Sequence, residues 1–257
     1  MIIIGEKLNS SIPSALKAFL SDNDDAIIEI IKAQADAGAD YIDINTAMLP
    51  DEELRLIKTM GLVINNSNVG IVIDTVNMEI VRKALPYAKD RSVIINSISL
   101  SADVSALSGY DLSNISVIAM PTTDEGIPET PENRLINTHV LIDHLLAMGF
   151  REENIYADIL IETTAVNQEA AITALNTLKL LKKKLPNIKT VCGASNISFG
   201  LPKRKYINAS FIAMAIYNGL DAIISDIANP DIRGAILSSE LLAGKDEYCM
   251  HYIDAMR

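Results

Sequence analysis

The chain has 257 residues, of which 49% are hydrophobic and 21% charged, and its formal net charge is −11. This composition is enough for a buried core and excludes a disordered chain, and the negative charge argues against nucleic acid as a partner, because phosphate binding draws on lysine and arginine. No segment approaches the roughly 18 uninterrupted apolar residues of a membrane span. The N-terminal MIIIGEK lacks a basic leader and a cleavable signal pattern, and only two cysteines occur, so a cytoplasmic location is expected.

Short apolar, β-branched runs recur along the chain, and most are followed by an amphipathic stretch. The eight runs lie near residues 2–4, 41–44, 71–74, 92–95, 115–119, 155–157, 189–192 and 222–224. Nearly continuous apolar runs are typical of parallel strands, in a closed barrel or in an open doubly wound sheet. The count of eight and the spacing of about 32 residues favour an α/β fold, a single (β/α)8 TIM barrel that forms one domain over 1–257.

Several helices between these strands carry recognisable start or stop signals. Residues 24–37 predict a helix that Gly38 ends. Thr130 and Asn229, each followed by proline, predict the N-caps of two later helices. A long helix is expected over 166–185, where the next residue, a proline, stops it.

Acidic and amide side chains recur where the apolar runs end. In a β/α barrel these positions open onto one rim, where such enzymes keep their chemistry. Buried carboxylates are costly unless they are paired or hydrogen-bonded, so a ring of them needs a partner. The residues are Glu6, Asn9, Asp43, Asn45, Asp74, Asn96, Asp158, Asn196 and Asp226.

A metal ion is one possible partner, but only three histidines occur and none lies at a strand end, so we predict no metal site. A phosphate group is a second possibility. The loop over 193–200 could offer backbone N–H groups, whereas Asp226 on the next loop would repel phosphate. The basic cluster of Lys203, Arg204 and Lys205 is either a solvated loop or a site for an anionic ligand tail.

A heterocycle rich in N–H donors is the third possible partner. A pterin ring carries an amino group beside a ring N–H, and these two donors match the two oxygens of one carboxylate. Asp74, Asn96 and Asp158 could surround such a ring, because an amide both donates and accepts hydrogen bonds.

The chain resembles the methyltetrahydrofolate:corrinoid protein methyltransferases, which belong to the pterin-binding superfamily that also contains dihydropteroate synthase. The resemblance covers nearly the whole chain, and its motifs follow one another in the same order. They are GEKLNSS at 5–11, DYIDINTA at 40–47, VIDTVN at 72–77, INSIS at 95–99, GIPETPENRL at 126–135, ADILI at 157–161 and GASNISFGLPKRKYINASFIAMAI at 193–216.

The resemblance implies roles for individual residues. Asp74, Asn96 and Asp158 match residues that hydrogen-bond the pterin in the family. Asn196 matches the asparagine that reaches the nitrogen bearing the methyl group. The expected catalytic residues are therefore Asn196, Asp74 and Asn96, whereas Phe199 departs from the polar residue that relatives often have.

The remaining rim residues are expected to bind substrate or to order the pocket. Asn9 and Asn45 could equally cap loop backbone. The other members of this group are Glu6, Asp43, Ser198 and Arg204.

The expected reaction moves a methyl group between N5 of methyltetrahydrofolate and the cobalt of a corrinoid. The corrinoid, a cobalamin, is expected on a separate protein, because the cobalt-ligating motif DxHxxG is missing from this chain. The resemblance also implies a homodimer. The residues do not set the direction of transfer. A dihydropteroate synthase-like enzyme and a non-catalytic folate-binding module of a larger complex are the alternatives.

Overall fold

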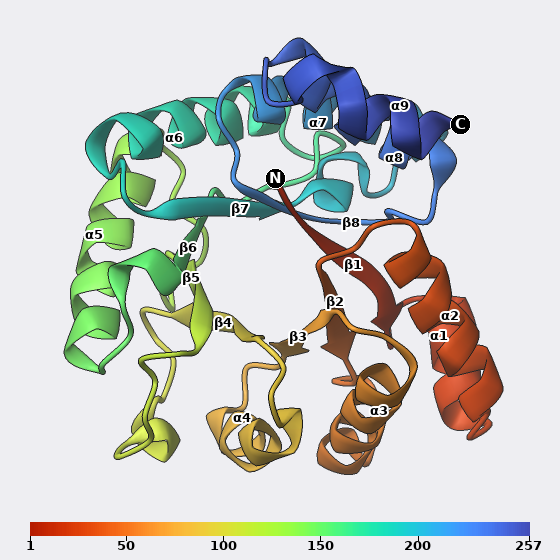
Figure 1. The fold of residues 1–257 in the computed structure, drawn as a ribbon. Coiled ribbons are helices and arrows are strands. Elements are labelled where there is room, and N and C mark those ends of the chain that lie inside the picture. Colours follow the sequence, from red (N-terminus) through yellow and green to blue (C-terminus); the bar gives the residue numbers. More distant parts are fainter.

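In the computed structural model, which describes all 257 residues, eight parallel strands close into a barrel in sequence order. Figure 1 shows the strands at the centre with the helices around them. This closed strand order confirms the predicted (β/α)8 barrel and rules out the open doubly wound sheet. The strands are β1 (Ile2–Asn9), β2 (Tyr41–Asn45), β3 (Gly70–Asp74), β4 (Val93–Ser99), β5 (Ser116–Met120), β6 (Ile155–Asp158), β7 (Lys189–Gly193) and β8 (Ala222–Ser225).

Nine α-helices accompany the strands, and none of them is both long and apolar enough to cross a bilayer. Two helices instead of one follow β1, and a short 3₁₀ turn over Ser105–Leu107 takes the place of a helix after β4. The helices are α1 (Pro13–Leu20), α2 (Asp24–Asp36), α3 (Glu52–Asn66), α4 (Met78–Ala84), α5 (Pro131–Ala147), α6 (Ala170–Lys184), α7 (Arg204–Tyr217), α8 (Pro230–Leu242) and α9 (Met250–Met256).

The helix ends follow the sequence signals in all but one case. Gly38 adopts a φ of +100° just after α2, and the side chains of Thr130 and Asn229 accept hydrogen bonds from the first turns of α5 and α8. The expected start of α6 at residue 166 is wrong, because the helix begins at Ala170. The side chain of Asn167 accepts from the N–H of Glu169 at 3.0 Å, and such local bonds favour a turn over a helix.

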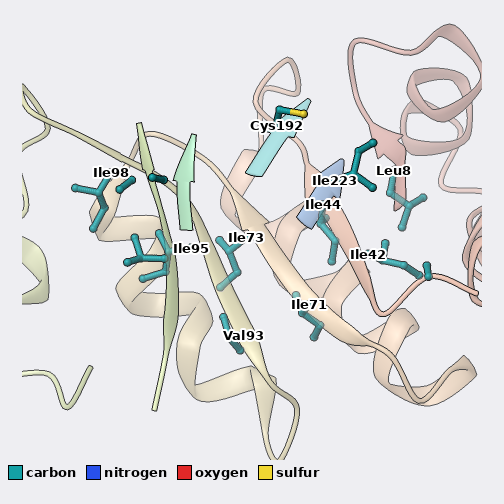
Figure 2. Close-up of a cluster of buried hydrophobic side chains, with 14 of the residues drawn as sticks. Leu8, Ile42, Ile44, Ile71, Ile73, Val93, Ile95, Ile98, Cys192 and Ile223 are labelled. Atoms are coloured by element: carbon teal, nitrogen blue, oxygen red, sulfur yellow. The ribbon is translucent and has the colours of Figure 1, made fainter. Parts of the chain in front are cut away.

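Two apolar layers build the barrel. The outer layer lies between strands and helices, and Figure 2 shows part of it, with Ile42, Ile71 and Ile95 from three neighbouring strands. The inner layer is a cluster of seven buried residues that fills the barrel. Its members are Ile4, Val72, Ile94, Ile118, Tyr156, Val191 and Ala222.

This inner cluster positions the polar residues of the rim. Successive side chains of a strand point to opposite faces, so a residue two positions after a member of the cluster also points into the barrel. Glu6 follows Ile4 by two positions, and Asp74 follows Val72. The same spacing applies to β4 and β6, so the apolar cluster forms the floor of a pocket and the polar residues form the layer above it.

Candidate active site

The layer above the floor consists of acidic and amide side chains from five strands. Glu6, Asp43, Asp74, Asn96 and Asp158 all lie near the carboxyl ends of their strands. Asp74 and Asn96 are direct partners in the pairing of β3 with β4, so their side chains are neighbours. Asp43 is almost fully buried and the other four are partly buried. The structure therefore brings the predicted pterin-binding residues together on one side of the barrel mouth.

Amide groups hold two of these carboxylates. Nδ2 of Asn45 donates to Oδ2 of Asp74 at 2.8 Å, and Nδ2 of Asn96 donates to Oδ1 of Asp43 at 3.2 Å. The two carboxyl groups also form a hydrogen bond with each other, in which Asp43 is the donor and Asp74 the acceptor. The lone pairs that remain in the layer can accept further hydrogen bonds from a ligand that carries N–H donors.

Burial changes the acidity of the layer. Removal from water, and then the charge of Asp74, raise the pKa of Asp43 well above its usual range. Burial also raises the pKa of Asp74 and raises that of Asp158 to about 6. The site is therefore a place in which negative charge is costly, and N–H donors from a ligand would reduce that cost.

Asn196 lies in a 3₁₀ turn over Ala194–Ser198 that follows β7. Its side chain is exposed at the mouth of the barrel. On β7, Gly193 lies two positions after Val191 and therefore faces inward, where a Cβ atom would come within 3.3 Å of Nδ2 of Asn196. The absence of a side chain at Gly193 leaves room for the Asn196 carboxamide.

Two side chains hold the turn that carries Asn196. The hydroxyl of Ser195 donates to Oε1 of Glu6 at 2.5 Å, and Nη2 of Arg204 donates to the carbonyl oxygen of Ser195 at 2.7 Å. Burial, and less strongly the nearby Asp226, raise the pKa of Glu6. The turn is thus tied to β1 on one side and to the start of α7 on the other.

A cavity of about 520 Å³ opens beside this turn, between the loops that follow β1, β7 and β8. Four of the predicted residues line it: Glu6, Asn9, Asn196 and Arg204. Asp43, Asn45, Asp74, Asn96 and Asp158 do not line this cavity. Apart from the fully buried Ser198, the predicted residues therefore form two adjoining groups, and Glu6 belongs to both.

The structure revises two expectations about the charges in this cavity. Asp226 was expected to repel a phosphate group, but Nζ of Lys7 lies 3.0 Å from its carboxylate and offsets its negative charge. The basic cluster is divided, because Lys205 pairs with Asp231 at 2.7 Å while Arg204 is bound to the turn after β7. Lys203 is exposed. The cavity therefore does not present three free cations to a ligand.

Asn9, Asn45 and Ser198 mainly support loops. Oδ1 of Asn9 accepts from the N–H and the hydroxyl of Ser11, so this residue caps the loop after β1. Asn45 accepts from the N–H of Ala47 in addition to its bond with Asp74. Ser198 is fully buried and its hydroxyl lies between Asn208 and Arg204, at 2.6 and 3.0 Å.

Sequence reasoning missed several residues around the site. Met120 lies two positions after Ile118 and so faces the pocket between Asn96 and Asp158. The two-residue alternation along β5 could have revealed it. Gly5 was missed as well, although a Cβ atom there would lie 2.5 Å from Oε1 of Gln34. That oxygen accepts from the N–H of Lys7, so Gly5 allows α2 to hold the strand beside Glu6.

The structure contains no group of three or more His, Cys, Asp or Glu side chains suited to a metal ion. The sequence prediction on this point stays a prediction. Acidic side chains, amides and an apolar floor fit a flat, nitrogen-rich ring better than a cation, because a cation needs several oxygens converging on one point.

Comparison with known proteins agrees with this chemistry. The family described as pterin binding enzyme matches residues 5–226. In an alignment of 264 positions, the chain is 31% identical to a methylcorrinoid:tetrahydrofolate methyltransferase of Eubacterium limosum, and the alignment covers 100% of this chain and 96% of the relative. It is also 24% identical to a methionine synthase of Mycobacterium tuberculosis, over 87% of this chain and 20% of that longer protein.

Solved structures show the same fold. A dihydropteroate synthase of Coxiella burnetii in complex with pteroic acid superposes with a TM-score of 0.69 at 17% identity, over 96% of this chain and 93% of that chain. The Yersinia pestis dihydropteroate synthase with a sulfonamide drug complex gives 0.71 at 14% identity, over 95% and 92%. These likenesses support the barrel, and the match over residues 5–226 confirms the resemblance found in the motifs: the chain belongs to the family of pterin-binding enzymes.

Proposed function

We propose that the protein is a methyltransferase that moves a methyl group between N5 of methyltetrahydrofolate and the cobalt of a corrinoid protein. One observation carries this proposal: the exposed carboxamide of Asn196 stands at the mouth of a barrel whose upper layer is made of carboxylates and amides. The similarity to the E. limosum methyltransferase extends over the whole chain and supports the same conclusion.

The polar layer suits the edge of a pterin ring. Asp158, once ionised, can accept the amino group and the adjacent ring N–H with its two oxygens. Asp74 and Asn96, neighbours on β3 and β4, provide an acceptor and an amide for the opposite part of the ring. The apolar floor beneath them provides contact area for the ring itself.

The methyl transfer itself breaks the N5–CH₃ bond. The methyl carbon bonds to cobalt(I), which supplies the electron pair, while the pair of the broken bond stays on N5 and takes a proton. Asn196 would donate a hydrogen bond to N5 and stabilise the transition state, and Asp74 and Asn96 would hold the water molecules that deliver the proton. A preorganised donor of this kind contributes roughly 3–4 kcal/mol in a site shielded from water.

The remaining predicted residues shape the site in this proposal. Glu6 fixes the turn that carries Asn196 through Ser195, and Asp43 fixes the amide of Asn96. Ser198 acts through Arg204, because it is fully buried behind that residue. Asn9 and Asn45 order the loops after β1 and β2, and Asn45 also orients Asp74.

A separate corrinoid protein would bring the cobalt to the barrel mouth. Four of the loops on this rim each carry a large exposed apolar side chain: Met48, Val76, Val166 and Phe199. Exposed apolar side chains around an opening are typical of a surface that binds another protein. Such a partner would also exclude water from the cobalt and from the methyl group.

The assembly and location of the enzyme are also part of the proposal. We propose a homodimer, which the exposed side chains of Tyr206, Met214 and Tyr217 on one face of α7 support. We propose a cytoplasmic location, since Cys192 and Cys249 are both free thiols.

A methyl-transfer assay tests the proposed reaction. The purified protein is mixed with methyltetrahydrofolate and reduced cobalamin, and the absorption of cobalt(I) is followed. We expect loss of the cobalt(I) signal with formation of tetrahydrofolate in equal amount. No reaction with free cobalamin or with any corrinoid protein would refute the proposal. Tight folate binding without any turnover would support the non-catalytic module instead.

Dihydropteroate synthase activity is the second candidate, because the solved structures that superpose on the chain carry that name. That reaction requires a site for a diphosphate leaving group. Lys205 is neutralised by Asp231, and Lys7 by Asp226, which leaves Arg204 and Lys203 for this task. An assay with hydroxymethylpterin diphosphate and p-aminobenzoate separates the two, and we expect no product.

A further inference from the structure

Arg134, near the start of α5, is fully buried. Arginine is rarely buried unless its donors are satisfied. Nε donates to the carbonyl oxygen of Pro128 at 2.8 Å, and Nη1 donates to those of Ile159 and Leu160 at 3.0 and 2.6 Å. Nη2 donates to Oε2 of Glu162 at 3.1 Å. The guanidinium group therefore joins the loop after β5 to the loop after β6.

The loop after β6 begins directly after Asp158. Leu160 has a φ of +56°, which is uncommon for a residue with a side chain. Its N–H donates to Oδ1 of Asp158 at 2.8 Å, while its carbonyl oxygen accepts from Arg134. Such a backbone conformation persists only where several contacts determine it. Leu160 is thus fixed on one side by Asp158 and on the other by Arg134.

We propose that Arg134 is a positioning residue of the pterin site, which holds the Ile159–Leu160 main chain so that the carboxylate of Asp158 faces the pterin edge. This inference rests on the proposed function, since it acts through the contact between Asp158 and the pterin. It predicts that changes at Arg134 alter folate binding without any direct contact between Arg134 and folate.

The charge of Arg134 gives this role a measurable consequence. Burial raises the pKa of Asp158 to about 6, and Arg134 opposes that rise. Cys192 on β7 belongs to the outer apolar layer, and burial, then the charge of Asp158, raise the pKa of its thiol well above the usual range, so it stays neutral. Glu162 carries the charge that partly neutralises Arg134.

Folate affinity should depend on pH through Asp158. Only the ionised carboxylate accepts two N–H donors, so affinity is present above the pKa of Asp158 and is lost as the pH falls through it. Removing the positive charge of Arg134 raises this pKa and moves the loss of affinity to higher pH. Removing the negative charge of Glu162 has the opposite effect.

The experiment is a calorimetric titration of methyltetrahydrofolate between pH 5 and pH 8.5, into the wild type and three variants. For Arg134→Met we expect the pH midpoint of binding to rise by about half a unit or more. For Glu162→Gln we expect it to fall. Arg134→Lys keeps the positive charge but loses the several hydrogen-bond donors of the guanidinium group. For this variant we expect an unchanged midpoint and an affinity at pH 8 reduced about tenfold, a loss equal in free energy to about one charge-assisted hydrogen bond.

Arg91→Lys is the matched control, because Arg91 also donates to two main-chain carbonyls, those of Ile64 and Ser67, at the opposite end of the barrel. We expect no change in affinity or midpoint. If Arg134→Met does not fold, Glu162→Gln decides the question, since its side chain is partly exposed. An unchanged midpoint in Arg134→Met, or in Glu162→Gln if Arg134→Met does not fold, would overturn the role of Arg134. Absence of folate binding by the wild type would overturn the proposed function and this inference with it.

Discussion

The hydroxyl of Ser195 donates a 2.5 Å hydrogen bond to Oε1 of Glu6, and this bond joins the turn that carries Asn196 to the first strand of the barrel. The two residues are 189 positions apart in the chain. Closure of the barrel between β8 and β1 brings them together. The place of Asn196 therefore depends on the fold as a whole.

The bond between Ser195 and Glu6 gives the first prediction. Glu6→Gln keeps an oxygen that accepts from Ser195, so we expect at least about a third of the wild-type methyl-transfer rate. Glu6→Ala and Ser195→Ala both remove the bond, and we expect each to lower the rate by about tenfold. Steady-state rates at saturating folate test this. A loss in Glu6→Gln as large as in Glu6→Ala would show that the carboxyl group itself is required.

Asn196 is predicted to act mainly in the transition state. Asn196→Ala should lower the methyl-transfer rate at saturating folate by more than about tenfold, because it removes the donor to N5. The dissociation constant for methyltetrahydrofolate should change much less. Stopped-flow measurement of cobalt(I) absorption gives the rate, and calorimetry gives the affinity. A rate close to that of the wild type would refute the assignment.

Gly193→Ala tests whether the Asn196 carboxamide needs the space beside β7. A methyl group at this position would lie 3.3 Å from Nδ2 of Asn196, and the φ of −82° at Gly193 is one that alanine adopts readily. We therefore expect a lower transfer rate with little change in Tm.

The same substitution made in the Asn196→Ala background should have no further effect on the rate, since the group that it crowds is gone. Equal effects of Gly193→Ala in both backgrounds would contradict this explanation.

Asp158 is predicted to lower stability at neutral pH. Its pKa rises from 3.8 to about 6 on folding, so the folded state binds the proton more tightly and this carboxylate destabilises the fold increasingly as the pH rises to about 6. Asp158→Asn keeps the acceptor for Leu160 and removes the charge. We expect it to stabilise the protein at pH 8 by roughly 2–3 kcal/mol at most, and by less at pH 5.

Thermal unfolding of Asp158→Asn and the wild type at the two pH values checks this expectation. The variant should gain more in Tm at pH 8 than at pH 5, while its folate affinity falls, because a side-chain amide donor replaces one carboxylate oxygen. Equal Tm differences at the two pH values would show that Asp158 is not the titrating group.

The sequence predicted the barrel and most of its polar layer because both depend on local patterns. Apolar runs mark the strands, and residues such as Asp74 and Asn96 follow a residue of the apolar floor by two positions in the sequence. The sequence did not reveal Arg134 or Ser195, because their partners come from distant parts of the chain. It also did not predict α1, and it placed the start of α6 too early because turn-forming side chains such as Asn167 compete with the helix.

The central claim is that the polar layer of this barrel binds the pterin ring of methyltetrahydrofolate. Calorimetric titration of methyltetrahydrofolate into the wild type, Asp74→Ala and Asp158→Ala at pH 8 tests it most directly. We expect one site per chain in the wild type and affinities at least about tenfold weaker in both variants. No binding to the wild type, or equal affinities in all three proteins, would contradict the account.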